Sequence, residues 1–123
     1  MIVKTIAVGP LEANCYVVAD EDTGEAVVID PGDEPDRIMD VLEGLKVRYI
    51  VLTHAHFDHV AALPDIKEAT EAKIAIHQEE KTVYETSKDM AAFWGYQMES
   101  LPEPDILLKE GDELTVGGLV FTV

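Results

Sequence analysis

The amino-acid sequence predicts an α/β (α+β) fold in which a mixed β-sheet carries helices on one face. Residues 1–30 have the pattern of strands joined by tight turns, and later strands alternate with helical segments. One of the later strands is apolar almost throughout. Strands joined by a tight turn lie antiparallel, whereas strands joined through a helix return parallel, so the two patterns together indicate a sheet of mixed direction.

Three strands are expected at the start of the chain, over residues 1–8, 14–20 and 25–30. Gly9-Pro10 interrupts the pattern after the first strand, because neither residue favours the interior of a strand. Residues 21–24 join the second and third strands as a hairpin turn with glycine at its last position.

A helix and a buried strand are expected next. Pro35 suits the first turn of a helix and Gly44 suits its end. Residues 47–52 are β-branched or apolar almost without a break, as expected of a strand that is covered on both faces. The apolar stripe of the helix consists of Ile38, Met39, Val41, Leu42 and Leu45.

Shorter elements are expected in the second half of the chain. A helix with Pro64 in its first turns and a charged helical segment lie on either side of a short strand. Gly117-Gly118 is a strong hairpin signal between two later strands. The helices are expected over residues 60–70 and 78–87, and the strands over residues 73–77, 113–116 and 119–123.

The composition indicates a single domain, residues 1–123, with a modest core, since 47% of its 123 residues are hydrophobic. The 25 acidic residues outnumber the 9 basic ones and give a net charge of −16. Such a field repels phosphate backbones and anionic lipids, so no nucleic acid and no membrane is expected as a partner. Cys15 is the only cysteine, and neither a signal peptide nor a membrane span is evident, so a cytoplasmic protein is expected.

The segment directly after the buried strand is rich in metal-binding side chains. It contains three of the four histidines of the chain and one aspartate. In an extended segment, His54 and His56 point the same way and can bind one ion. Asp58 and His59 lie just beyond them and can face a second ion. Imidazole nitrogen and carboxylate oxygen are ligands that Zn²⁺ and similar divalent metals prefer.

His54-x-His56-x-Asp58-His59 after a buried strand resembles the signature of the metallo-β-lactamase superfamily. Residues 14–18, followed by residues 27–32, are similar to the opening of its hydroxyacylglutathione hydrolase (glyoxalase II)-like branch. The resemblance implies an α/β/β/α sandwich, of which this chain holds about the N-terminal half. The inner sheet face is then expected to lack a partner within the chain and to self-associate or to meet further sequence.

The resemblance also implies a mechanism. His54 and His56 would bind a first metal, and Asp58 and His59 a second, with one or two Zn²⁺ per full-length chain. Iron or manganese would suit the same ligands. A metal-bound hydroxide, oriented by Asp58 as a catalytic residue, would attack a small-molecule thioester or related acyl substrate.

The number of ligands leaves other functions open. Catalytic zinc usually has three protein ligands, and residues 54–59 offer two for each ion. The family's remaining ligands would lie beyond residue 123, so the chain by itself is expected to have little or no activity. One alternative is a mononuclear iron enzyme that resembles persulfide dioxygenases. Another is a non-catalytic half-domain that self-associates.

Several other side chains have two interpretations. Asp30 either supports a ligand imidazole from behind or caps the turn at its strand end. His77 is either a further metal ligand or a structural histidine. Thr53 can hydrogen-bond near the site or serve only as a strand residue, and Cys15 is expected to be a buried apolar group rather than a reactive thiol. The aromatic residues between 93 and 96 fit a core or an interface better than a substrate mouth.

Overall fold

The computed structural model describes residues 1–9, 13–53, 62–93, 95 and 101–123. Its first half contains β1 (Ile2–Val8), β2 (Ala13–Ala19), β3 (Glu25–Ile29), α1 (Pro35–Leu42) and β4 (Lys46–Leu52). The second half contains α3 (Leu63–Thr70), β5 (Lys73–His77), the 3₁₀ turn η1 (Gln78–Glu80), α4 (Lys81–Phe93), β6 (Ile106–Leu108), β7 (Glu113–Val116) and β8 (Leu119–Thr122).

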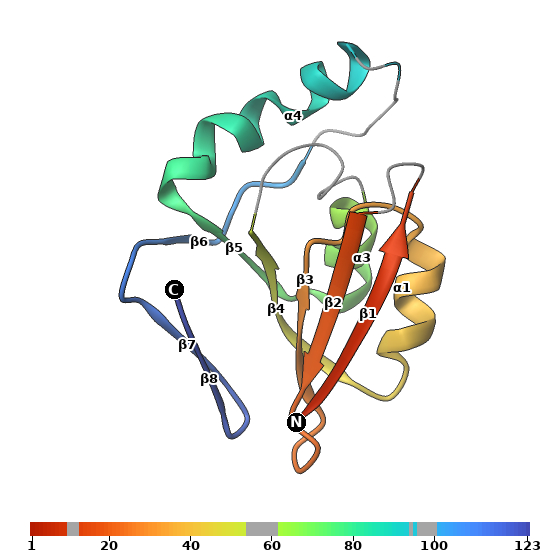
Figure 1. The fold of residues 1–123 in the computed structure, drawn as a ribbon, viewed down its shortest axis with the longest axis vertical. Helices are drawn as coiled ribbons and strands as arrows, with labels where there is room; N and C mark the ends of the chain where they lie inside the picture. Colours follow the sequence, from red (N-terminus) through yellow and green to blue (C-terminus); the bar gives the residue numbers. More distant parts are fainter. Residues whose placement is uncertain (10–12, 54–61, 94, 96–100) are drawn as a thin grey trace.

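Six strands form one mixed sheet in the order β1-β2-β3-β4-β5-β6, and β7 pairs with β8 in a separate hairpin. The pairs β1–β2 and β2–β3 are antiparallel, whereas β3, β4, β5 and β6 are parallel to one another. The sequence-based prediction of a mixed sheet is therefore confirmed. Because β3, β4 and β5 run in the same direction, their carboxyl ends meet at one edge of the sheet (Figure 1).

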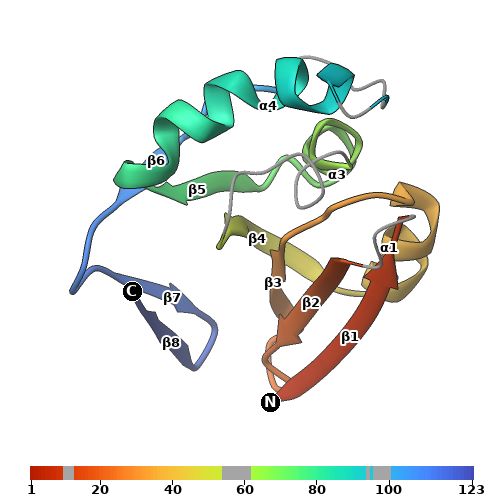
Figure 2. The ribbon, with the colours of Figure 1, turned by 45° about the horizontal axis from the view of Figure 1, so that its top comes forward.

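The main sheet separates two layers. Helices α1 and α3 cover one face, and the β7–β8 hairpin lies on the other (Figures 1 and 2). The larger apolar core fills the space between the helices and the sheet, where Ile38 of α1 and Ile66 of α3 are fully buried against Ile50 and Ile74. Burial of each such side chain contributes about 1.5–3 kcal/mol.

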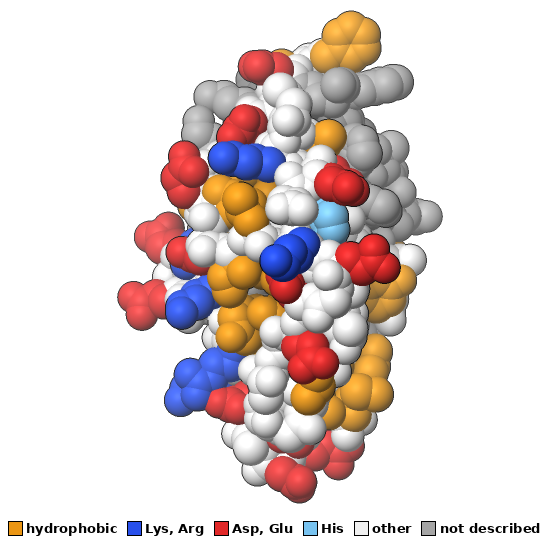
Figure 3. All heavy atoms as spheres, turned by 90° about the vertical axis from the view of Figure 1, so that its left-hand side faces the viewer, with side chains coloured by type: hydrophobic (Ala, Val, Ile, Leu, Met, Phe, Trp, Pro, Cys, Tyr) orange, Lys and Arg blue, Asp and Glu red, His pale blue; other side chains and the backbone are white. Residues whose placement is uncertain are grey.

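The hairpin covers part of the sheet face that was expected to lack a partner within the chain. Ala75 and Leu108 of the main sheet are buried against Leu114 of β7. That expectation is therefore wrong for this part of the face, because the Gly117-Gly118 turn folds two strands of the same chain over it. Hydrophobic side chains nevertheless remain at the surface on this side of the molecule (Figure 3). The exposed ones on β6 and beyond include Leu107, Val120 and Val123.

Two elements differ from the sequence-based expectation. Helix α4 continues to Phe93, beyond the expected end at residue 87. Strand β6 was not expected, because its three residues follow a proline-rich loop and are too few to show the alternation of apolar and polar side chains that marks a strand. The Asp105 carboxylate accepts hydrogen bonds from Ile74 N (2.8 Å) and Lys67 Nζ (3.0 Å), and this aligns β6 with β5.

In the part of the chain that the structure describes, no helix combines the length and the apolar character needed to cross a membrane. The expected cytoplasmic location stays a prediction.

The turn of the β7–β8 hairpin is tied to the β2–β3 turn through Asp20. The buried Asp20 carboxylate accepts hydrogen bonds from Gly118 N (2.7 Å), Thr23 Oγ1 (3.1 Å) and Asp22 N (3.2 Å). Gly117 lies in the left-handed region (φ 56°), and a Cβ there would collide with the Asp20 carboxylate, so only glycine fits. These hydrogen bonds, above all the one from Gly118, lower the pKa of Asp20.

Replacing Asp20 by asparagine should destabilise the fold near neutral pH, since asparagine offers one acceptor oxygen where Asp20 uses two. Because the folded pKa of Asp20 is lowered, its charged form stabilises the fold above about pH 4, and this contribution is lost as the pH falls through the lowered pKa. Urea unfolding should show a gap between wild type and D20N that narrows in acid. Asp22→Asn removes the same charge from the same turn and should change the midpoint little; equal effects of the two substitutions would contradict the role of Asp20.

Candidate functional site

The four side chains predicted to bind metal lie outside the described residues. They belong to segment 54–61, which begins after Thr53 at the end of β4 and ends before Ala62 at the start of α3. The segment therefore leaves the sheet at the carboxyl edge of the parallel strands, where ligand sites of α/β sheets are commonly found. The four side chains are His54, His56, Asp58 and His59.

The residue before the segment is held by Asp30, which follows β3. The Asp30 carboxylate is 3% exposed and accepts hydrogen bonds from Thr53 N (2.8 Å) and from the Thr53 hydroxyl. Asp30 N donates to the carbonyl oxygen of Val51 (3.0 Å). These contacts join the end of β3 to the end of β4 immediately before His54.

The residue after the segment is held by the neighbour of Asp30. Ala62 N donates to the carbonyl oxygen of Pro31 at 3.0 Å. The two described residues that flank segment 54–61 are thus bound by two consecutive residues of one loop, residues 30–34, called here the β3 exit loop. This loop therefore links the end of β4 to the start of α3.

The β3 exit loop has an unusual backbone and also holds the end of β1. Asp30 (φ 55°) and Glu34 (φ 52°) both adopt the left-handed conformation, which costs about 1–2 kcal/mol for a residue other than glycine. Glu34 Oε2 accepts hydrogen bonds from Gly9 N (2.9 Å) and Arg37 Nη1 (3.1 Å), and the first of these does most to lower the pKa of Glu34. Strained backbone of this kind persists where surrounding contacts fix it, often at functional sites.

The structure bears on one interpretation of Asp30 and on that of Thr53. The Asp30 carboxylate binds the backbone and the hydroxyl of Thr53 at the end of β4, so of the two interpretations of Thr53 the structure supports the hydrogen-bonding one. Support of a ligand imidazole by Asp30 stays a prediction, because the imidazoles lie outside the described residues.

His77 ends β5 at the same edge of the sheet, one strand away from Thr53. Its Nδ1 accepts a hydrogen bond from Glu79 N at 3.1 Å and so caps the η1 turn. In the neutral imidazole the proton is then on Nε2. This capping supports the structural interpretation of His77. Within the described ranges, no three His, Cys, Asp or Glu side chains gather as a metal site.

Cys15 and Phe93 take no part in a described site. The Cys15 thiol is fully buried, and burial together with the charge of Asp30 raises its pKa to about 12. Its expected role as an apolar group is therefore confirmed, because the thiolate is the reactive form.

Phe93 is 80% exposed and does not belong to the core. Trp94 and Tyr96 lie outside the described residues.

The fold and the position of the histidine-rich segment define an α/β protein with a candidate metal site at the carboxyl edge of a mixed sheet. The sequence profile of the Metallo-beta-lactamase superfamily matches residues 8–123. The chain belongs to the metallo-β-lactamase superfamily.

Two relatives match this chain over its full length. An uncharacterised protein of Aquifex aeolicus is 40% identical over 125 residues, and the match covers 100% of this chain and 58% of the relative. Hydroxyacylglutathione hydrolase GloC of Haemophilus influenzae is 29% identical over 132 residues, with 100% of this chain and 59% of the relative covered. The chain thus spans a little over half the length of these relatives.

Solved structures share the fold. The B3 metallo-beta-lactamase BLEG-1 aligns over 98% of this chain and 59% of its own, with a TM-score of 0.85 and 29% identity. TTHA1623 in a di-iron-bound form aligns over 91% of this chain and 57% of its own, with a TM-score of 0.83 and 37% identity. The metallo-β-lactamase-like fold expected for the N-terminal part is therefore present.

Replacing Thr53 by valine should lower the free energy of unfolding by about 1–2 kcal/mol, because the buried Asp30 carboxylate loses its hydroxyl donor. Urea unfolding measures this loss. Thr115→Val makes the same change at an exposed position of β7 and should stay within about 0.5 kcal/mol of wild type. Equal losses in both variants would mean that the Thr53–Asp30 contact does not hold the end of β4.

Proposed function

We propose that the intact protein is a metal-dependent hydrolase that acts on a thioester or a related acyl bond. The observation that carries the proposal is that the sequence His54-x-His56-x-Asp58-His59 follows β4 directly, in a segment whose flanking residues, Thr53 and Ala62, are both bound by the β3 exit loop. Membership of the superfamily supports the hydrolytic chemistry. The name of the GloC relative supports a thioester, since that protein is called a hydroxyacylglutathione hydrolase.

His54 and His56 would hold one metal ion, and Asp58 and His59 a second. Their imidazoles and carboxylate suit zinc, iron and manganese, so the residues present fit the group. When bound, such an ion supplies a Lewis acid for the substrate carbonyl and lowers the pKa of its water.

The described residues contribute by positioning this segment. Asp30 binds both the backbone and the hydroxyl of Thr53, and Pro31 binds Ala62, so segment 54–61 has fixed end points. Fixed end points reduce the reorganisation needed to bring the four ligands together. Asp58 would in addition orient the attacking water, which is the catalytic role proposed for it.

Iron-dependent chemistry is the second candidate. TTHA1623, which is 37% identical to this chain, was solved in a di-iron-bound form. That relative supports iron, whereas the name of BaeB from Bacillus velezensis, a probable polyketide biosynthesis zinc-dependent hydrolase that is 29% identical, supports zinc. An enzyme resembling persulfide dioxygenases, with one iron per chain, is the alternative; TTHA1623 supports its metal but not the number of ions. The acyl substrate and self-association through the exposed sheet face stay predictions.

Replacing His54 or His56 by alanine in the intact protein should weaken zinc affinity by more than about 100-fold, since loss of outer-shell partners alone costs about 10- to 100-fold. Competition with a chromogenic chelator measures this affinity. His77→Ala removes a histidine at the same sheet edge and should retain the affinity, because its Nδ1 serves the η1 turn. Loss of zinc in His77→Ala but not in His54→Ala would overturn the ligand assignment.

The two candidate chemistries can be separated with the intact protein loaded with either zinc or iron. The hydrolase proposal expects release of free thiol from a glutathione thioester without oxygen uptake, and expects loss of that release in Asp58→Ala. Thiol release is followed with a chromogenic disulfide and oxygen with an electrode. Oxygen uptake on a persulfide by the iron form alone, with no thioester turnover by either form, would favour the alternative.

A further inference from the structure

A groove lies at the edge of the sheet opposite the candidate metal site. Its volume of about 770 Å³ exceeds those of two other hollows in the described part of the chain, which are about 400 and 270 Å³. It opens because β4 begins at Lys46 whereas β5 begins at Lys73, which pairs with Tyr49. The first residues of β4 therefore extend beyond β5. The volume is within the range of about 300–1,000 Å³ that is typical of small-molecule sites.

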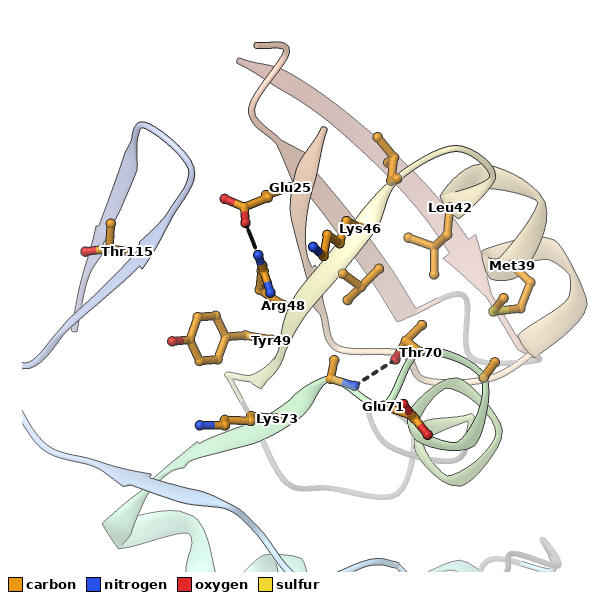
Figure 4. A pocket seen from close by; sticks show the side chains of 14 residues that line it. Glu25, Met39, Leu42, Lys46, Arg48, Tyr49, Thr70, Glu71, Lys73 and Thr115 are labelled. Carbon is orange, nitrogen blue, oxygen red and sulfur yellow. Dashed lines mark hydrogen bonds and ion pairs between the residues drawn. The ribbon is translucent and has the colours of Figure 1, made fainter. Parts of the chain in front are cut away.

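The two sides of the groove differ in chemistry (Figure 4). Met39 and Leu42 lie on the α1 side, whereas Arg48, Tyr49 and Lys73 lie toward the β7–β8 hairpin. One side therefore offers aliphatic surface, and the other offers cations and a phenol. The full apolar lining consists of Met39, Leu42, Leu45, Val47, Ala69 and Ala72.

The charge of the groove contrasts with that of the whole chain. Lys46, Arg48 and Lys73 are 3 of its 9 basic residues in a protein of net charge −16. Arg48 Nε donates to Glu25 Oε1 at 2.6 Å. The side chains of Lys46 and Lys73 form no hydrogen bond or close ion pair with the residues that the structure describes, although the charge of Lys46 acts on the Glu25 carboxylate and that of Lys73 on the Asp105 carboxylate. The lining thus has three cations against two carboxylates, Glu25 and Glu71, and Glu25 is already paired with Arg48.

The local cations decide what can bind here. At physiological salt, exposed charges more than about 8 Å apart are largely screened from one another, so distant acidic side chains contribute little. An anionic group near Lys46 and Lys73 is therefore attracted in spite of the overall negative charge.

We propose that this groove binds a small amphipathic anion, namely a medium-chain fatty carboxylate. Its carboxylate lies near Lys46 and Lys73, and its alkyl chain lies on the aliphatic side formed by α1, α3 and Val47. The binding requires no metal and does not depend on the proposed hydrolase activity.

Isothermal titration of the metal-free chain with hexanoate, octanoate and decanoate tests the proposal. The affinity should rise by up to about fourfold for each methylene added, as the chain covers more apolar surface. Methyl resonances of Leu42, Val47 and Ala72 should shift on addition of decanoate. Decanol has the alkyl chain without the negative charge, and inorganic phosphate has the charge without the alkyl chain. Each should therefore bind at least about tenfold more weakly than decanoate.

Matched variants locate the anion. The double variant Lys46→Gln/Lys73→Gln should bind decanoate about tenfold more weakly, since each exposed cation raises the affinity for an anion by up to about fivefold. Lys4→Gln/Lys109→Gln removes the same net charge outside the groove and should bind as wild type. Equal weakening in both double variants, decanol binding as tight as decanoate, or methyl shifts confined to residues outside the groove would each overturn the proposal.

Discussion

The candidate site depends on the hydrogen bonds between the β3 exit loop and the two residues that flank segment 54–61, Thr53 and Ala62. Asp30 adopts a left-handed backbone that costs about 1–2 kcal/mol, and its carboxylate and amide together make three contacts with the end of β4. The next residue, Pro31, binds Ala62 at the start of α3. A strained conformation is thus offset by buried hydrogen bonds that each contribute about 1 kcal/mol or more. The loop therefore fixes the end points between which any metal-binding geometry must form.

The two faces of the main sheet are covered by different kinds of contact, and one face is covered only in part. Helices α1 and α3 bury long aliphatic side chains against β4 and β5 in the larger of the two apolar clusters. The hairpin on the other face buries fewer residues, and its turn is fixed to the sheet by Asp20, a polar contact. A small apolar contact supplemented by one buried carboxylate is more sensitive to pH and to single substitutions than the helical side. Further surface for contact remains where Val120 and Val123 are exposed.

Local patterns predicted most of the fold and the chemical type of the site. The pattern of residues 73–77 predicted the bounds of β5 without error, and Pro35 and Gly44 predicted the ends of α1 closely. Both predictions succeed because the alternation of a strand and the end signals of a helix are carried by neighbouring residues. Strand β6 was missed because its register depends on Asp105 and Ile74, which are distant in sequence. The Gly118–Asp20 contact spans 98 positions and leaves no periodic signal. At the site, Asp30 could be singled out by residue type, but the Pro31–Ala62 bond joins two backbone groups and could not.

Strand β4 connects the proposed anion groove to the candidate metal site, and the two should act independently in electrostatic terms. It runs from Lys46 in the groove to Leu52 at the candidate metal site, and six steps of about 3.3 Å separate these ends by about 20 Å. That distance exceeds two screening lengths of about 8 Å at physiological salt, so an anion in the groove should change the charge balance at the metal edge very little. Mechanical coupling is a separate matter, because β4 is buried on the helical side and a shift of its register would move Thr53 relative to Asp30. An effect of groove occupancy on metal affinity would therefore indicate displacement of β4 along the sheet rather than a long-range field.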